Sequence, residues 1–200
     1  MHAVTRRTLL AAAASAYAAP PRAHAAEKTC LGTLLARRHM IRKFKPDPVP
    51  DAAVRRLIDA ATRAPSAGHT EPWSFVVVRD ESTRRQLARA ALSQMFVAEA
   101  PVVIVPCAEL SRSRARYKAR GDRYALIDVS FASMLLLLAV TEAGLGACFV
   151  GAMDDGEVAR ILGLPENVQP LAVVPIGVPA EKPRRLGRRK LDQVIRNGRW

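Results

Sequence analysis

Two pairs of arginines are the side chains in this sequence with the clearest chemical potential. Arg38 and Arg42, within ARRHMIRKF, are four residues apart, so on a helix or tight turn both project from one side. Arg188 and Arg189, within GRRKL, lie near the other end of the chain. Planar guanidinium groups bind phosphate oxygens through paired hydrogen bonds. If the two pairs converge in space they form a phosphate site; taken alone, they could simply be solvated surface arginines.

Other familiar kinds of site are not indicated. The sequence GLGACFVG (144–151) is expected to lead from a helix into a strand, whereas a dinucleotide or phosphate loop leads from a strand into a helix. Four scattered histidines and three cysteines without a CxxC pair predict no metal site. Cys107 and Cys148 stand in apolar runs, which indicates small buried residues.

Composition narrows the class of protein. Two hundred residues, half of them apolar, suffice for one domain with its own core. The net charge of +13 attracts anions, among them phosphorylated cofactors, acidic proteins, lipid headgroups and nucleic acid. Only 5% of the residues are aromatic, which leaves few platforms for stacking bases. A basic nucleic-acid-binding module is therefore the weaker alternative, and no nucleic-acid partner is expected.

The first 25 residues have the pattern of an export signal. Arg6 and Arg7 precede the apolar stretch 9–19, and Ala23-His24-Ala25 follows as an A-x-A cleavage site. The paired arginines resemble a twin-arginine signal, which predicts a periplasmic location; a misassigned start, with a cytoplasmic protein, is the alternative. Residues 26–200 then form one domain. The apolar run SFASMLLLLAV is bracketed by acidic residues too closely for a transmembrane helix, so no stable membrane anchor is expected.

The elements that must position the arginines follow from hydrophobic periodicity. A helix is predicted behind Pro50 and Asp51, ending near Ala64 because Pro65 follows. The remaining pattern predicts helices over 81–91, 128–143 and 154–162, and strands over 73–78, 101–105, 147–150 and 171–176. This order favours an α+β layered domain. The helix over 128–143 is apolar nearly all round, which favours a central core helix or the seam of a homodimer.

The order of four segments resembles the compact nitroreductase family. These are ARRHMIRKF, RAPSAGHTEPWSFVVV, QMFVAEAPVVIVPCAE and the stretch from DVSFASMLLLLAV to PLAVVPIGVP. The resemblance as a whole covers nearly all of residues 31–195. The resemblance implies a flavin oxidoreductase with a three-layer α+β fold, in which helices flank a mostly antiparallel central sheet. It also implies an intertwined homodimer with two FMN molecules at the subunit interface.

The resemblance further implies roles for particular residues. Arg38 is expected to meet the FMN phosphate, and Arg42 the phosphate or the C2 carbonyl edge of the ring. His39 and Met40 belong to the same motif, but Met40 stands where the family has serine, so only its backbone could bind. Either Arg188 or Arg189 supplies the C-terminal phosphate ligand.

A second set of site residues is implied by the loop that reaches the ring from the other subunit. The positions are Pro65, Ser66, Ala67 and His69, with His69 in place of asparagine and Glu71 in place of glutamine. Gln94 matches a polar position near the ring or ribityl chain, and Val150 and Gly151 match a strand end whose backbone approaches the ring. Met134 and Leu135 replace a Gln-Asn pair of compact relatives, which puts the role of that pair in doubt here.

Flavin chemistry explains why no acid–base pair or nucleophile stands out, because the cofactor itself accepts hydride at N5. We expect Arg42 to stabilise the reduced ring, and a ping-pong cycle between a small donor, such as NAD(P)H, and an acceptor such as a nitroaromatic or a quinone. Glu71, if it points at the ring, lowers the redox potential.

The cations of 112–123 could dock an acidic redox protein or form a solvated loop. A flavin-binding protein without turnover is a further alternative.

Overall fold

The computed structural model describes residues 30–183 and 186–200. The predicted export signal, residues 1–25, lies outside the described residues, so its prediction stays untested.

A single antiparallel sheet forms the centre of the domain. Its strands run in the order β1 (Trp73–Val78), β2 (Val102–Glu109), β5 (Val174–Gly177) and β3 (Gly146–Ala147), and β4 (Val168–Pro170) pairs with the far end of β2. All of these pairings are antiparallel. The β-branched residues of β2 are buried on both faces, as expected for a central strand covered on both sides.

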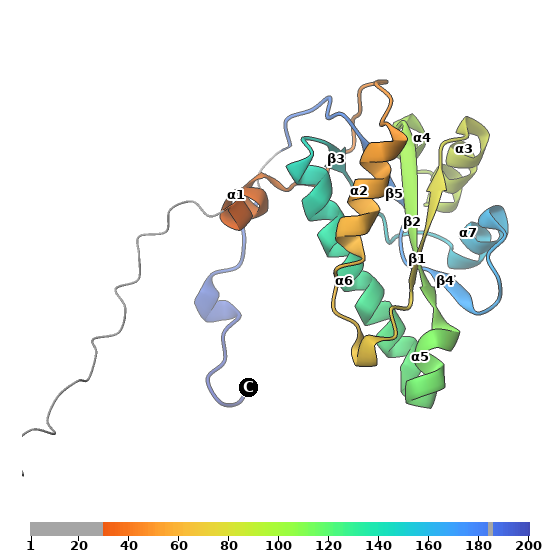
Figure 1. Cartoon of the computed structure of the whole chain (residues 1–200). Helices are drawn as coiled ribbons and strands as arrows, with labels where there is room; N and C mark the ends of the chain where they lie inside the picture. The colour runs from red at the N-terminus through yellow and green to blue at the C-terminus, as the bar shows by residue number, and fades with distance from the viewer. Residues whose placement is uncertain (1–29, 184–185) are drawn as a thin grey trace, which may run out of the picture.

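The helices form the two outer layers. Their bounds are α1 Cys30–Arg37, α2 Asp51–Ala61, α3 Glu81–Ala90, α4 Phe96–Glu99, α5 Leu110–Tyr117, α6 Gly121–Glu142 and α7 Asp155–Leu162, with short 3-10 turns η1 Ala67–His69, η2 Lys118–Arg120 and η3 Leu191–Gln193. Figure 1 shows α2 and α6 over one face of the sheet and α3 and α7 over the other.

The two cores follow from the alternation of side chains along β2. Val102 and Ile104 pack with Leu57 and Leu136 of α2 and α6. The intervening Val103 and its alternate neighbours pack into the second core, with Leu87 of α3 and Val158 of α7. The expected three-layer α+β fold is therefore confirmed.

The longest helix, α6, begins earlier than predicted, at Gly121 rather than at residue 128. With α5 it makes one stretch, Leu110–Glu142, that is long and apolar enough to cross a membrane by length and composition, and 44% of its apolar window is buried within the domain. The packing of α6 against α2 and the sheet is that of a core helix. Ile127, Phe131 and Met134 nevertheless remain exposed along one side of it.

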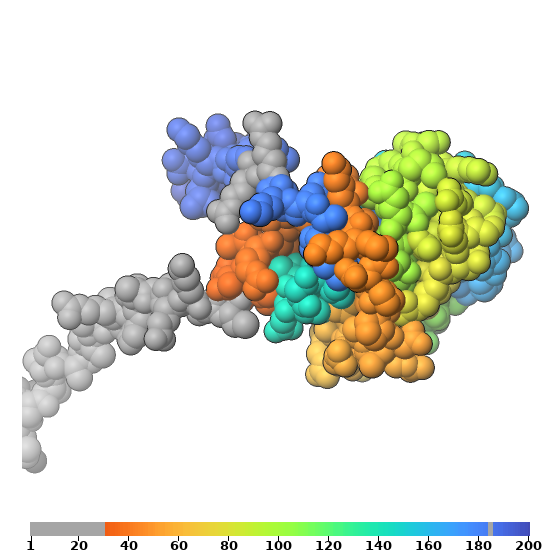
Figure 2. Space-filling view, turned by 90° about the horizontal axis from the view of Figure 1, so that it is seen from above, coloured from red at the N-terminus to blue at the C-terminus, as the bar shows by residue number. Residues whose placement is uncertain are grey.

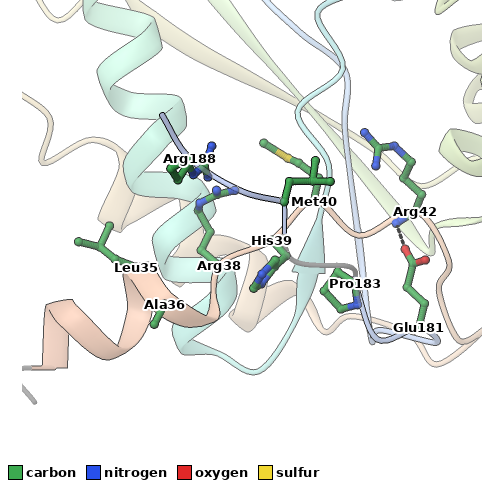
Figure 3. Close-up of a pocket in the computed structure, with 10 residues that line it drawn as sticks. Leu35, Ala36, Arg38, His39, Met40, Arg42, Glu181, Pro183 and Arg188 are labelled. Atoms are coloured by element: carbon green, nitrogen blue, oxygen red, sulfur yellow. Dashed lines mark hydrogen bonds between the residues drawn. The ribbon is translucent and has the colours of Figure 1, made fainter. Parts of the chain in front are cut away.

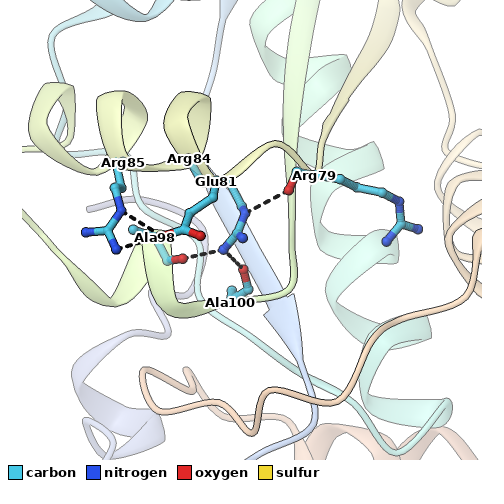
Figure 4. Close-up of polar contacts among 6 residues, drawn as sticks. All are labelled: Arg79, Glu81, Arg84, Arg85, Ala98 and Ala100. Carbon is cyan, nitrogen blue, oxygen red and sulfur yellow. Dashed lines mark hydrogen bonds and ion pairs between the residues drawn. The ribbon is translucent and has the colours of Figure 1, made fainter.

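Arg84 joins α3 to the chain entering β2 (Figure 4). Its Nη1 donates hydrogen bonds to the carbonyl oxygens of Ala98 and Ala100, and its Nε donates to the carbonyl of Arg79 at 3.2 Å. The neighbouring Arg85 instead pairs with Glu81 at 2.7 Å on the exposed side of α3. One partly buried guanidinium thus satisfies three carbonyls that α4 and the adjoining loops leave free.

Several elements were predicted correctly. α2, β1, α3 and α7 match the expected ranges within a few residues. Asp154 caps α7 as expected, because its carboxylate accepts a hydrogen bond from the Glu157 N–H at 2.9 Å. Cys107 and Cys148 are buried, as predicted, and burial raises the pKa of the Cys107 thiol to about 12 and raises that of Cys148.

Three strand predictions were wrong in extent. β2 continues past Pro106 to Glu109, because β4 pairs with its end and the Pro106 carbonyl accepts from Leu171 N–H. The strand predicted over 147–150 is β3 at 146–147 followed by an isolated bridge at Val150. The strand predicted over 171–176 is β5 over 174–177, preceded by the separate short strand β4.

Candidate functional site

The segment that follows α1 lies against the chain that leaves the sheet near the C-terminus. Ile41 N–H donates to the carbonyl of Ala147 in β3 at 2.9 Å. On the other side, Lys45 N–H donates to Val178 O at 2.8 Å, and Ala180 N–H donates to Lys43 O at 2.9 Å. These backbone bonds bring the two ends of the described domain together.

Gly146 allows the close approach of this segment to β3. A Cβ at this position would lie 2.7 Å from Cγ1 of Ile41, well inside the van der Waals contact distance. Because Gly146 has no side chain, Ile41 can bury its own at the sheet edge. The run from Arg38 to Arg42 is therefore held against β3 at Ile41.

A pocket of about 550 Å³ opens beside this segment. Figures 1 and 2 show α1 (orange-red) and the C-terminal segment (blue) together on one side of the domain, away from α3. Both contribute to the pocket wall, which is formed by Leu35, Ala36, Arg38, His39, Met40, Arg42, Glu181, Pro183, Leu186 and Arg188. In Figure 3 the side chains of Arg38 and Arg188 lie at one side of the pocket and that of Arg42 at the other.

The polar groups of the pocket favour an anionic ligand. Three guanidinium groups outnumber the single carboxylate, that of Glu181. Nη1 of Arg38 is buried and makes no hydrogen bond within the described part of the chain. A buried donor without an acceptor is costly, so this nitrogen is poised to donate to an added anion.

Glu181 is held by backbone rather than by a cation. Its Oε1 accepts hydrogen bonds from the N–H groups of Arg42, at 2.5 Å, and Lys43, at 3.1 Å. The guanidinium of Arg42 is thereby left unpaired with this carboxylate and lies 5.9 Å from the centre of the Phe96 ring. Met40 contributes its thioether, because Sδ accepts from Phe149 N–H at 3.4 Å.

Five of the residues predicted for the site meet in this pocket, namely Arg38, His39, Met40, Arg42 and Arg188. The other C-terminal candidate, Arg189, does not line it, and its Nη2 donates to Gln193 O at 2.5 Å. The helical spacing assumed for Arg38 and Arg42 was wrong. α1 ends at Arg37, so the two arginines do not share a helix, although the Arg38 N–H still donates to the Leu34 carbonyl at 2.8 Å where the helix ends.

Other pocket residues were missed by the sequence analysis. Glu181 has one available signal, an acidic residue within the basic segment AEKPRR, but nothing in the sequence shows that its partners are backbone N–H groups. Leu35 is exposed on α1 beside the pocket mouth. An exposed leucine at this place is suited to contact a bound ligand or another protein chain.

The loop Pro65–Glu71 lies elsewhere, beside α5 and the N-terminal half of α6 (Figure 1). Ala67 N–H donates to Oδ2 of Asp128 at 3.0 Å, and Glu71 N–H donates to Oγ of Ser66 at 3.1 Å. Asp128 is only 3% exposed, and desolvation raises its pKa, although the bond from Ala67 opposes this shift. Within one chain the loop adds no residue to the pocket wall.

The tip of this loop has an unusual backbone. Gly68, His69 and Glu71 have φ values of 55°, 56° and 44°. Left-handed conformations at the last two cost energy and concentrate where a site needs them. The His69 ring is exposed, and its Nε2 lies 3.8 Å from Oε1 of Glu71. In this chain the Glu71 carboxylate is thus directed toward His69, with 45% of the side chain exposed.

Gln94, Val150 and Gly151 lie together near β5. The Gln94 side-chain amide donates to Ala152 O at 3.3 Å, immediately after Gly151. Val150 is buried and bridges to Val173, while Gly151 is exposed. The structure thus places these three near one another, but none of them lines the arginine pocket.

The nitroreductase family model matches residues 35–99 and 92–178. This range includes most of the sheet, most of the helices and the pocket residues from Leu35 to Arg42. The chain belongs to the nitroreductase family. Membership supports a flavin oxidoreductase in general terms. The resemblance identified from the sequence motifs is therefore confirmed.

Individual relatives agree with this assignment. An NADH dehydrogenase of Thermus thermophilus is 35% identical over 191 residues, spanning 82% of this chain and 93% of that protein. Iodotyrosine deiodinase 1 of Rattus norvegicus is 29% identical, spanning 81% of this chain and 67% of that protein. The structure of NADPH:FMN oxidoreductase from Vibrio harveyi in complex with NAD+ superposes with a TM-score of 0.77 at 26% identity, spanning 84% of this chain and 76% of that one.

Proposed function

We propose that this nitroreductase-family protein is an FMN-dependent oxidoreductase and that the arginine pocket holds the FMN phosphate. The observation that carries the proposal is the buried, unpaired Nη1 of Arg38 beside Arg188 and opposite Arg42. A dianionic phosphate would satisfy this donor and balance the surplus cation charge. The volume of about 550 Å³ lies within the usual range for cofactor and ligand pockets.

The residues of the pocket would contact different parts of the bound cofactor. Arg38 and Arg188 would hold the phosphate, and Met40 would offer an apolar wall, with its backbone able to bind as well. Arg42 lies on the far side of the pocket, where a guanidinium would stabilise negative charge on the reduced ring. FMN supplies hydride and electron transfer at its N5 atom, so the protein need only bind, orient and tune it.

The second half of the site is proposed to come from a partner subunit. The loop Pro65–Glu71 is strained at its tip, and it lies away from the pocket of its own chain. In an intertwined homodimer the loop of one subunit would cover the ring held by the other, with Ser66, Ala67 and His69 at the ring edge. Gln94 and the chain around Val150 and Gly151 would border the same cleft.

The proposed cycle is ping-pong. A reduced donor, NAD(P)H or another carrier, reduces the flavin and leaves, and a small electrophile such as a nitroaromatic or a quinone then takes two electrons. The name of the relative from Thermus thermophilus supports a nicotinamide donor. The name of the deiodinase relative supports a second candidate for the reaction with the acceptor, namely reductive dehalogenation.

The decisive experiment combines colour with two neighbouring arginines. The purified protein should be yellow, its flavin absorbance should bleach with NADH or dithionite and return with a quinone, and denaturation should release FMN. Arg188→Ala should weaken FMN binding about 10- to 100-fold, the loss expected for one to two charge-assisted hydrogen bonds. Arg189→Ala, the matched control outside the pocket, should stay within about threefold.

Failure of this experiment would take one of three forms. Equal losses in the Arg188 and Arg189 variants would refute the assigned phosphate site. Bound flavin without turnover would favour the non-catalytic flavin-binding protein. A colourless protein that shifts RNA on a gel in a salt-dependent manner would favour the nucleic-acid module.

We also propose that residues 1–25 direct export through the twin-arginine route. The pattern from Arg6 to Ala25 supports it, and that route carries proteins that fold around a cofactor before export. Expression of the full chain should yield a periplasmic form that begins at residue 26. A double change of Arg6 and Arg7 to Lys should leave the precursor in the cytoplasm. A protein of full mass in the cytoplasm in both cases would contradict the proposal.

A further inference from the structure

The segment that joins β2 to α6 carries a dense set of cations. We call it the α5 basic surface, and its members are Arg112, Arg114, Arg116, Lys118, Arg120 and Arg123, all exposed. Among the described residues, the acidic partner paired with a member of this set is Asp122, whose carboxylate binds Arg114 at 2.5 and 2.8 Å. Several like charges therefore remain uncompensated on a short helical projection.

The segment is folded rather than a solvated loop. α5, η2 and the start of α6 follow one another without a gap, and Gly121 permits the turn, since a Cβ there would lie 2.5 Å from the backbone nitrogen of Arg114. Lys118, at the turn, has φ 48°. The charges are consequently presented in a fixed arrangement, which a docking surface requires and a flexible tail lacks.

The α5 basic surface is joined to the proposed ring-covering loop. Nε of Arg112 donates to Thr70 O at 2.8 Å, and the Thr70 hydroxyl lies 3.2 Å from that of Ser113. Arg116 and Tyr117 lie so close to Gly68 that a Cβ there would come within 2.4 Å of both side chains. A molecule bound to the basic surface would thus lie beside the loop that is proposed to cover the flavin.

The composition of the surface disfavours a membrane as its partner. Interfacial helices anchor through exposed large apolar side chains beside their cations. Among the described residues, α5 and η2 have no exposed large apolar side chain, and Ile127 lies one turn of α6 beyond Arg123, at the border of the surface. Leu110 at the start of α5 is buried. Charge complementarity without apolar insertion is instead typical of transient docking between redox proteins.

We infer that the α5 basic surface docks an acidic electron-carrier protein that reduces the flavin held across the subunit interface. The inference rests on the proposed flavin function and specifies its donor. Two molecules of a reduced one-electron carrier would each lose one electron, and the flavin would take up both electrons with protons from water. The surface concentrates the carrier by electrostatic steering, and the loop beside it leads to the ring.

The test uses an acidic [2Fe–2S] ferredoxin as the probe and two matched charge reversals in the full-length holoprotein. Lys118→Glu with Arg120→Glu changes the basic surface, whereas Arg55→Glu with Arg56→Glu makes the same change in net charge on the exposed side of α2. Stopped-flow absorbance follows flavin reduction by reduced ferredoxin, anaerobically, at about 20 mM and about 500 mM ionic strength. Calorimetric titration with oxidised ferredoxin measures docking without any need for turnover.

The surface variant should be reduced about 10-fold more slowly and bind ferredoxin about 10-fold more weakly at low ionic strength, because steering raises association rates by roughly 10- to 1000-fold. The difference should vanish at high ionic strength, where the screening length is only about 4 Å. The α2 variant should stay within about twofold. Reduction by dithionite should be equal in all three proteins.

Equal rates in all three proteins, or equal slowing of both variants, would overturn the inference, since net charge rather than this surface would then be responsible. Sedimentation with phosphatidylcholine–phosphatidylglycerol vesicles tests the alternative that the surface binds a membrane. Loss of vesicle binding in the surface variant, with unchanged ferredoxin kinetics, would assign the surface to a membrane and also overturn the inference. A wild-type protein without flavin refutes the proposed function, while the calorimetric titration still decides whether ferredoxin docks.

Discussion

Glu71 puts a carboxylate at the strained tip of a loop that is proposed to face a flavin. Its neighbour His69 lies 3.8 Å away and is exposed, so it gives the carboxylate little neutralisation unless it is protonated. A negative charge within about 8 Å of the reduced ring, at an effective dielectric of about 20–40, costs about 1–2 kcal/mol. If the loop covers the ring as proposed, this carboxylate would tune the flavin rather than bind it.

Glu71→Gln should accordingly raise the FMN midpoint potential by roughly 20–40 mV, the two-electron equivalent of that energy. Spectroelectrochemical titration of both proteins at pH 7 measures the shift. Glu99→Gln, on α4, serves as a control that changes net charge equally. An unchanged potential in the Glu71 variant would mean that this carboxylate does not face the ring.

Asp128 supports the same loop from within α6, and its titration should appear in the stability of the protein. Burial raises its pKa in the folded state above the ordinary value of 3.8. The stability that this group contributes is therefore fully present below about pH 3.8 and is lost as pH rises through the raised pKa. Each tenfold change in the acid dissociation constant corresponds to about 1.4 kcal/mol.

Asp128→Asn should remove this pH dependence while keeping an oxygen that accepts from Ala67 N–H. Urea unfolding from pH 4 to pH 8 should show the variant gaining free energy of unfolding relative to wild type as pH rises, followed by a plateau. The opposite slope would show that the native carboxylate is stabilised by its hydrogen bond more than it is destabilised by burial.

At the residue scale, a sequence motif indicated which distant residues lie together, whereas their role in binding stays a prediction. Arg38 and Arg188 are far apart in the chain, and only the family pattern suggested that they meet; both line one pocket. Glu181 escaped notice because its partners are the N–H groups of Arg42 and Lys43, which are available only after the segment is placed against β3. Arg188 could not be separated from Arg189 because adjacent residues in extended chain point in different directions.

At the scale of single elements, the junction of α3 with the chain entering β2 depends on one side chain. Arg84 satisfies carbonyls of Arg79, Ala98 and Ala100, and hydrogen bonds from a charged donor contribute about 1.5–3 kcal/mol each at most. Arg84→Met keeps much of the apolar stem but removes the donors. We expect a loss of about 2–3 kcal/mol in the free energy of unfolding, measured by urea denaturation.

Arg85 is the natural control for this change. It is the next residue on α3, and it forms an exposed pair with Glu81 of the kind that contributes about 0.3–0.5 kcal/mol. Arg85→Met should therefore lower stability by no more than about 0.5 kcal/mol. Equal losses in the two variants would mean that helix propensity, rather than the three carbonyl bonds, accounts for the effect of Arg84.

Periodicity and turn residues predicted the elements whose signals are local. α2 follows Pro50, α7 follows the capping Asp154, and the β-branched run of β1 matches its strand. The start of α6 was missed because the charged residues between Gly121 and Asp128 resemble a loop, although the helix buries Ala125 against its neighbours. β4 was missed because three residues carry no periodic signal, and only its partner β2 makes it a strand.

At the scale of the whole molecule, the domain exposes apolar surface that its own sheet does not cover. Ile127, Phe131 and Met134 lie along one side of α6 at helical spacing. Further exposed apolar side chains lie on α1 and in the C-terminal segment, namely Leu31, Leu35, Leu186, Leu191, Val194, Ile195 and Trp200. Leu35 and Leu186 also line the pocket, so part of this apolar surface borders it, and exposed apolar surface of this extent indicates a protein–protein interface.

A homodimer in which α6 packs on its counterpart would bury this surface and would bring the Pro65–Glu71 loop to the partner's pocket. Phe131→Glu places a charge in that interface and should weaken dimerisation at least about 100-fold, a cost of about 3 kcal/mol. Sedimentation velocity across protein concentrations should show a dimer for wild type and a monomer for the variant. Because the proposed flavin site needs both subunits, FMN affinity should fall in parallel.

Leu92→Glu is the control for this experiment, since Leu92 is 70% exposed but lies beyond α3, away from α6. It should leave both the dimer and the bound FMN unchanged. If Phe131→Glu stays dimeric, α6 is not the seam. If it becomes monomeric and still holds FMN with full affinity, each chain completes its own flavin site, and the partner's loop has no part in it.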